Sequence, residues 1–191
     1  MGDGYSRTAR LLMRIEPLAL VGAAMLRLDR QADSRGYFAR SFCRDTLAAA
    51  GLHTDYPQHN ISFNALAGTV RGLHFQLCPY EEVKIISCVR GAIFDVIVDL
   101  RPGSPTFRKW HAATLSAANG DALYAPAGFA HGFQTLCDDV EVRYLMGANF
   151  VHGAAGGIRY NDAALSIPWP LPVSAISERD LALPTLSQDD L

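Results

Sequence analysis

The sequence predicts an all-β domain, a double-sheet jelly roll with a few short helices. Short runs rich in β-branched and aromatic residues recur along the 191-residue chain, and glycine, proline, asparagine or aspartate separates most of them. In addition, the segment 68–76 is echoed about sixty residues later by the segment 126–133. Each segment carries a histidine that follows a glycine near a strand end. A jelly roll lines one cavity from its two sheets with paired segments of this kind.

The strands follow from the same pattern, taken in chain order. They are predicted at 18–21, 25–30, 36–42, 58–64, 68–75, 83–90, 92–99, 110–115, 121–125, 131–136 and 140–146. The run 92–99 has the character of a buried strand. Its two carboxylates, Asp95 and Asp99, are four residues apart and therefore point to the same face.

Two short helices are predicted. Asp45 is a candidate N-cap for the helix that starts at Thr46, and Gly51 ends that helix. Ser177 starts a second helical turn, because the run from Ser177 to Asp180 has the spacing of a capping box. The glycine-rich segment 150–162 is expected to be a long loop. Residues 1–12 form an extension before a single domain over 13–191.

Composition narrows the class of function. The net charge is −2 and the pI is near 6.3, so there is no electrostatic case for binding nucleic acid or acidic membranes. The longest apolar run near the N-terminus, 18–26, is too short to span a bilayer. The four cysteines are scattered without a C-x-x-C motif, which indicates a reducing cytoplasm rather than a zinc or redox site.

The two histidine segments carry the chemistry. In metal-binding jelly rolls the first segment reads His-x-His followed by an acid, and the second adds one more histidine. Here the second position is Gln76, between His74 and Glu81, and the later segment supplies His131. Glutamine is a poor ligand for transition metals, so the pattern favours proton chemistry. A metal site made of these four residues remains the alternative.

A base and a cation can share one pocket. Strand alternation puts His74 and Gln76 on one face, with Arg71 on the other, and it aligns Lys84 with Ile86. If 68–76 and 83–90 are neighbouring strands, a neutral imidazole could abstract a proton next to a carbonyl. The nearby ammonium would then stabilise the charge that develops on oxygen.

Such a base needs an orienting carboxylate on its other ring nitrogen. The residues leave four candidates open: Asp95, Asp99, Asp162 and Asp180. Each of these residues, taken alone, could also have a purely structural role, because histidines on strands are usually hydrogen-bonded structural residues. In the same way, Asp180 could serve only as a carboxylate at a helix N-terminus.

The chain resembles the dTDP-4-dehydrorhamnose 3,5-epimerase family from about Met13 to Leu183. Ordered motifs carry the resemblance: Asp33-Ser-Arg35-Gly-Tyr-Phe38, Gln58-His-Asn60-Ile-Ser62, Val70-Arg-Gly-Leu-His-Phe-Gln76, Cys88-Val-Arg-Gly-Ala-Ile-Phe-Asp-Val-Ile-Val-Asp99, Gly103-Ser-Pro-Thr-Phe107, Pro126-Ala-Gly-Phe-Ala-His-Gly-Phe133, Gly157-Ile-Arg-Tyr-Asn-Asp162 and Ile176-Ser-Glu-Arg-Asp180. The family implies a jelly-roll (cupin) homodimer. It acts on a nucleotide-linked 4-keto-6-deoxyhexose without a metal or an organic cofactor.

The resemblance also implies roles for single residues. His74 matches the catalytic base, Asp180 the carboxylate that orients it, and Lys84 the cation that stabilises the enolate. The substrate-binding positions are Arg35, Phe38, Gln58, Asn60, Arg71, His131, Tyr144 and Phe150. Arg71 and Arg35 fall at diphosphate-binding positions, and Arg35 is expected to reach the partner subunit's site.

The chain departs from the family at two positions. The family's catalytic tyrosine lies in a Tyr-x5-Tyr run, and that spacing from Tyr144 reaches Phe150, which has no proton to give. Water, Tyr144, Tyr160 or His152 could replace it. Arg40 occupies a position where the best-known members have an acid near the nucleotide base, so the base is left open.

The sequence therefore predicts an epimerase that inverts C3, C5 or both, with inversion of a single carbon favoured by Phe150. Two alternatives remain. One is a sugar-nucleotide-binding protein that has lost catalysis, and the other is the metal-dependent cupin.

Overall fold

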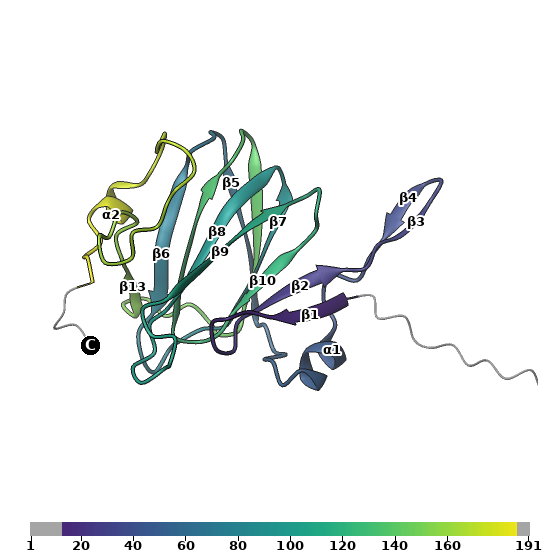
Figure 1. Ribbon diagram of the computed structural model, residues 1–191, viewed down its shortest axis with the longest axis horizontal. Coiled ribbons are helices and arrows are strands. Elements are labelled where there is room, and N and C mark those ends of the chain that lie inside the picture. Colours follow the sequence, from purple (N-terminus) through teal and green to yellow (C-terminus); the bar gives the residue numbers. More distant parts are fainter. Residues whose placement is uncertain (1–12, 187–191) are drawn as a thin grey trace, which may run out of the picture.

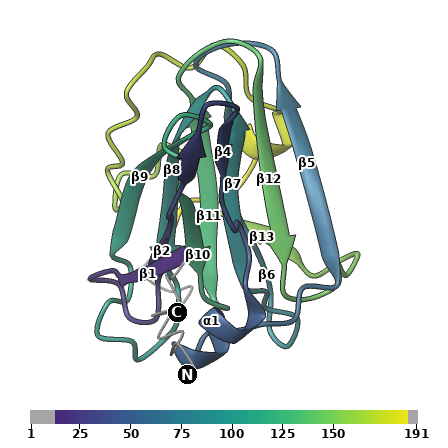
Figure 2. The same ribbon diagram turned by 90° about the vertical axis from the view of Figure 1, so that its right-hand side faces the viewer.

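The computed structural model describes residues 13–186 and forms a sandwich of two sheets (Figures 1 and 2). The six-stranded sheet has the order β1-β2-β10-β7-β12-β5, and the five-stranded sheet has the order β13-β6-β11-β8-β9. The fold class predicted from the sequence is confirmed: strands dominate, and the two described helices are short.

The element bounds, taken sheet by sheet, are as follows. The six-stranded sheet contains β1 (Met13–Pro17), β2 (Ala24–Leu28), β5 (Gln58–Asn64), β7 (Lys84–Arg90), β10 (Ala122–Ala125) and β12 (Val140–Met146). The five-stranded sheet contains β6 (Val70–Gln76), β8 (Ala92–Asp99), β9 (Trp110–Ser116), β11 (Phe129–Thr135) and β13 (Ala155–Gly157). A separate hairpin is formed by β3 (Gln31–Asp33) and β4 (Gly36–Phe38), and the helices are α1 (Arg44–Ala49) and α2 (Glu178–Leu181).

Three apolar layers hold the sandwich together. The central layer lies between the sheets and includes Ile86, Ile97 and Phe133. A second layer, centred on Leu47 of α1, covers one end of the six-stranded sheet. A third lies on the outer face of the five-stranded sheet beneath the C-terminal segment, which Figure 1 shows in yellow. The β3–β4 hairpin projects away from all three layers (Figure 1).

Most predicted strands are present, and the errors have local causes. The strands at 58–64, 92–99 and 140–146 have the predicted bounds, and most others shift by one or two residues. The predicted strand 18–21 is a turn, closed by the hydrogen bond from Leu18 N to Ala23 O, with Gly22 in the left-handed region. The predicted strand 36–42 ends at Phe38.

Three strands and one cap were not predicted correctly. β1 and β3 were missed, and β13 lies inside the expected loop 150–162, where its glycine-rich backbone pairs with β6. The first helix has Cys43 at its N-cap, so Asp45 lies in the first turn and does not cap it. The second helix begins as predicted, because the Ser177 side chain accepts a hydrogen bond from Asp180 N.

A bulge in β6 reorients the strand that carries His74. His74 pairs with His131 and Arg71 pairs with Phe133, so two residues of β6 lie opposite the single residue Gly132. A Cβ atom at Gly72 would lie 2.7 Å from Gly132 Cα, so this close approach requires glycine. The bulge places Arg71 and His74 on the same wall of one cavity, whereas strict alternation had predicted opposite faces.

A buried carboxylate stabilises the turn after β8. Asp99 accepts hydrogen bonds from Arg101 Nε at 2.8 Å, Ser104 Oγ at 2.6 Å and Thr106 Oγ1 at 2.7 Å. Burial alone would raise the pKa of Asp99, but these hydrogen bonds outweigh it and lower the pKa below its usual value. Asp99 is therefore a structural residue rather than the partner of a catalytic histidine.

We expect Asp99→Asn to lower the free energy of unfolding by about 3 kcal/mol at neutral pH. Because the folded-state pKa is depressed, the charge stabilises the fold above the unfolded value of about 3.9 and the effect is lost as pH falls through the folded pKa. The difference between wild type and variant in urea unfolding should therefore shrink below about pH 4. A difference of equal size at pH 7 and at pH 3 would show that the charge contributes nothing.

No described helix is long and apolar enough to cross a membrane.

Candidate active site

A cavity of about 340 Å³ opens between the two sheets at the end where His74 lies. Strands β5, β6, β7, β11 and β12 contribute to its walls, together with β13, α2 and the segment around Phe150. The residues that line it are Asn60, Ile61, Ser62, Arg71, His74, Phe75, Gln76, Glu82, Lys84, His131, Phe133, Tyr144, Met146, Phe150, Ala155, Gly156 and Arg179.

His74 pairs with Asp180 at the cavity wall. Nε2 of His74 lies 2.7 Å from Asp180 Oδ1, and the second oxygen of Asp180 accepts the backbone N–H of Gly72 at 3.0 Å. The His74 side chain is 38% exposed, whereas that of Asp180 is 6% exposed. Burial would raise the pKa of Asp180, but the hydrogen bonds from His74 and Gly72 lower it overall. This carboxylate is therefore held in its charged form beside the imidazole.

The other candidate aspartates serve different groups. Asp95 lies 2.7 Å from Nε2 of His131, and Asp99 stabilises its own turn. Asp162 accepts the backbone N–H groups of residues 164, 165 and 186. Of the four aspartates that the sequence left open, the structure pairs Asp180 with His74.

His131 forms a second and deeper histidine–aspartate pair. Asp95 is fully buried, and burial raises its pKa although the charges of His131 and Lys84 oppose the shift. The ring of His131 meets that of Tyr144 edge to face, with centroids 6.0 Å apart. The hydroxyl of Tyr144 lies 3.1 Å from Ser62 Oγ, and burial raises the pKa of this hydroxyl, so it carries its proton at neutral pH.

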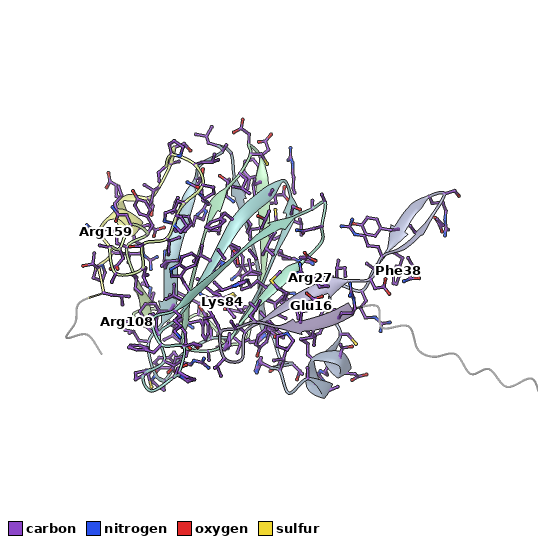
Figure 3. All side chains as sticks on the ribbon, in the orientation of Figure 1. Glu16, Arg27, Phe38, Lys84, Arg108 and Arg159 are labelled. Atoms are coloured by element: carbon purple, nitrogen blue, oxygen red, sulfur yellow. The ribbon has the colours of Figure 1, made fainter. Side chains whose placement is uncertain are left out.

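Lys84 reaches the cavity from the sheet opposite His74. β6 and β7 belong to the two facing sheets and are not hydrogen-bonded to each other, so the condition that they are neighbouring strands is not met. Nζ of Lys84 donates to the backbone oxygen of His74 at 3.1 Å and lies 3.0 Å from Glu82 Oε1. In Figure 3 Lys84 lies within the body of the sandwich. Glu82 was missed in the sequence, where the neighbouring Glu81 was considered instead.

Gln76 joins two loops and is not placed as a metal ligand. Its Nε2 donates to Glu82 at 3.0 Å and to the backbone oxygens of Tyr80 and Asn149, while its Oε1 accepts from Val151 N at 2.8 Å. Glu81 does not line the cavity. Among residues 13–186, no group of three histidine, cysteine, aspartate or glutamate side chains could hold a metal ion. These contacts leave the metal-dependent alternative without a ligand set in that range.

Two arginines lie at the cavity. Arg71 is fixed by its Nε donating to Asn64 Oδ1 at 2.6 Å, and Arg179 lines the wall from α2. Sequence reasoning missed Arg179, although it directly precedes Asp180 in a matching motif. The two guanidinium groups give the cavity a local positive charge despite the negative net charge of the chain.

The remaining predicted residues divide into two groups. Asn60, Tyr144 and Phe150 line the cavity, and Gln58 supports it by accepting the backbone N–H of Phe150 at 2.8 Å. Arg35 and Phe38 lie on the projecting hairpin and do not line the cavity of their own chain; Figure 3 shows Phe38 there. Of the proposed replacements for the missing acid, Tyr144 lines the cavity, whereas Tyr160 and His152 do not.

Comparison with known proteins adds to this geometry. A sequence model of the dTDP-4-dehydrorhamnose 3,5-epimerase family matches residues 17–188. A dTDP-4-dehydrorhamnose 3,5-epimerase from Sinorhizobium fredii is 41% identical over 181 residues, which cover 92% of this chain and 91% of that protein.

Solved structures agree with this match. An enzyme of the same name from Bacillus anthracis, with TDP and PPi bound, has a TM-score of 0.88 at 40% identity and covers 91% of this chain and 99% of that one. ChmJ, a 3'-monoepimerase from Streptomyces bikiniensis, was solved with dTDP as a double mutant, with a TM-score of 0.81 at 32% identity. The match covers 89% of this chain and 86% of that one. The mutant replaces a histidine by asparagine and a tyrosine, 70 positions later, by phenylalanine.

Proposed function

The chain belongs to the dTDP-4-dehydrorhamnose 3,5-epimerase family and is a sugar-nucleotide epimerase, and we propose that its cavity inverts C3, C5 or both in a nucleotide-linked 4-keto-6-deoxyhexose. The observation that carries the mechanism is the 2.7 Å contact between His74 and a buried carboxylate, at a cavity that Lys84 also lines. The C4 ketone of such a sugar makes the neighbouring C–H groups acidic.

His74 is the proposed base. Asp180 can only accept a hydrogen bond, so it holds the proton of the imidazole on Nε2. The lone pair of Nδ1 is then available to take the proton from carbon. As the imidazolium forms, the adjacent carboxylate stabilises its charge. The two electrons of the broken C–H bond move into an enolate whose negative charge lies on the C4 oxygen.

Lys84 is the proposed stabiliser of that enolate. Its ammonium enters from the sheet opposite His74, whereas His131 lies on β11, next to His74 in the five-stranded sheet. The ammonium can donate to an oxygen that gains charge during the reaction, which lowers the barrier more than it strengthens substrate binding. His131 also needs a carboxylate to fix its tautomer, and Asp95 supplies it.

Tyr144 is the proposed acid on the face opposite His74. It stands on β12, whereas His74 stands on β6 in the facing sheet, and its buried hydroxyl keeps a proton to give. His74 and Tyr144 are 70 positions apart, as are the histidine and the tyrosine replaced in the ChmJ mutant. Phe150 is 58% exposed at the rim, where an aromatic ring suits contact with the nucleotide.

Replacing the two rings separately tests this assignment. We expect Tyr144→Phe to slow inversion about 10²-fold at the carbon it protonates while His74 still removes protons. Phe150→Tyr should change inversion little. NMR of dTDP-4-keto-6-deoxyglucose in deuterium oxide separates exchange from inversion at C3 and C5. If Phe150→Tyr instead adds inversion at a second carbon, the missing hydroxyl of Phe150 restricts the native enzyme to one carbon.

The diphosphate is proposed to bind Arg71 and Arg179. A guanidinium presents several N–H donors in a plane that matches phosphate oxygens. Arg71 is already oriented by Asn64, so little side-chain entropy remains to be lost on binding. The rest of the nucleotide site is proposed to come from Arg35 and Phe38 of a second subunit, because the β3–β4 hairpin that bears them projects from the body of its own chain.

The homodimer is proposed to form through the outer face of the six-stranded sheet. On β5, Ser62 and Asn64 turn inward to Tyr144 and Arg71, so Phe63 between them faces outward. Phe63 is 50% exposed, and Val89 on β7 of the same sheet is 41% exposed. Apolar side chains gathered on a sheet face are typical of a contact with a second protein surface.

Light scattering should give about twice the 20.8 kDa mass of one chain. Phe63→Glu should shift this mass toward a single chain, and it should also lower activity because each site would lose the partner's hairpin. A single-chain mass for an active wild type would contradict both the dimer and the shared site.

The NMR experiment in deuterium oxide also tests the function as a whole: label entering C3 or C5 supports it, and unchanged substrate overturns it.

The compartment is proposed to be the cytoplasm, since all four cysteines are free thiols.

A further inference from the structure

Glu82 is a buried carboxylate that the mechanism so far leaves without a role. It lies at the cavity between two donors: its Oε1 is 3.0 Å from Lys84 Nζ, and its Oε2 accepts Gln76 Nε2 at 3.0 Å. The side chains of Glu82 and Lys84 are 7% and 6% exposed. A buried charge pair of this kind carries a desolvation penalty, so it is weak evidence for stability and invites a functional explanation.

The geometry limits what Lys84 can do. An ammonium has three N–H donors. In the part of the chain that the structure describes, two acceptors contact it: Glu82 Oε1 and the backbone oxygen of His74 at 3.1 Å. One donor is therefore left for the cavity. The backbone oxygen comes from the residue that supplies the proposed base, so the ammonium is fixed relative to that base.

We propose that Glu82 is a positioning residue for epimerisation: it holds the Lys84 ammonium so that its remaining N–H points at the C4 oxygen of the substrate. This inference rests on the proposed function of the cavity. The stabilisation of an enolate depends on donors that are already in place when the charge develops. A flexible lysine side chain lacks this property unless a neighbour restrains it.

Glu82 is itself firmly anchored. Gln76, which contacts it, also donates to the backbone oxygens of Tyr80 and Asn149 and accepts from Val151 N. Both oxygens of Glu82 are needed, since each faces a different donor, and an amide in its place has only one acceptor. Asp95 acts on Lys84 through its charge, whereas Glu82 touches it directly.

The experiment compares Glu82→Gln with the matched control Glu81→Gln, the neighbouring acid outside the cavity. We expect Glu82→Gln to lower kcat for deuterium exchange about 10- to 100-fold, part of the loss seen when an oxyanion donor is removed. KM and dTDP affinity should stay close to wild type, Tm should fall because the buried Lys84 ammonium loses its partner, and Glu81→Gln should match wild type throughout. Glu82→Asp, which keeps the charge but is shorter, should fall between wild type and Glu82→Gln.

A second arm shows whether Glu82 acts through Lys84. In a Lys84→Met background, Glu82→Gln should change exchange less than about twofold, because the group it positions is gone. The inference is overturned if Glu82→Gln keeps the wild-type kcat, if its loss is as large in the Lys84→Met background, or if only Tm falls. If wild type itself exchanges no label, the proposed function fails first and the inference fails with it.

Discussion

His74→Ala is expected to abolish solvent exchange at both C3 and C5 while leaving the fold intact. Proton transfer by a positioned side chain contributes about 10²- to 10⁴-fold, and no other described imidazole at the cavity is paired with Asp180. The variant removes the imidazole ring and leaves the backbone of residue 74 in place. Lys84 donates to the carbonyl oxygen of His74, which alanine keeps. The loss can therefore be assigned to the missing base rather than to a displaced lysine.

The measurement is NMR of substrate incubated in deuterium oxide, together with dTDP affinity and Tm. His152→Ala is the matched control, because His152 is an exposed histidine that does not line the cavity. It should exchange label at the wild-type rate. Exchange by His74→Ala near the wild-type rate would move the base to another residue, with His131 the next imidazole in the cavity.

The fold was predictable where local pattern and tertiary environment agree. β8 is buried on both faces and reads as a continuous apolar run with two carboxylates, so its bounds were predicted correctly. β13 could not be predicted, because three small residues form a strand only where the edge of β6 offers hydrogen bonds. The hairpin β3–β4 was only partly predicted for a related reason: its strands are hydrogen-bonded to neither of the two main sheets and are three residues each.

The site was less predictable from the residues alone. His74 stands out through its glycine-rich strand, but its partner lies 106 residues later on a four-residue helix. Only the family resemblance connected the two. Strand alternation predicted that Arg71 and His74 face opposite sides of the sheet. The bulge at Gly72 makes this prediction wrong, since one extra residue moves a side chain to the other face. Glu82 was missed because burial, not residue type, distinguishes it from Glu81.

Asp180→Asn is expected to slow exchange about 10³-fold while leaving dTDP affinity nearly unchanged, because the amide selects the wrong tautomer of His74. The two oxygens of Asp180 face two donors, Gly72 N–H and His74 Nε2. The backbone N–H of Gly72 can only donate, so the amide oxygen must turn toward it. The amide NH₂ then faces Nε2, which becomes an acceptor. The ring proton moves to Nδ1, the nitrogen that should take the proton from substrate.

The same variant separates catalysis from helix structure. Asp180 lies in the first turn of α2, but Ser177 provides the cap by accepting Asp180 N–H at 3.1 Å, and asparagine keeps that backbone group. If Asp180 served only the helix, Asn would cost a few tenths of a kcal/mol of stability and exchange would continue. A wild-type exchange rate in Asp180→Asn would thus refute the dyad. A slow rate with unchanged Tm supports it, because a change of tautomer alters proton transfer without altering the packing around the ring.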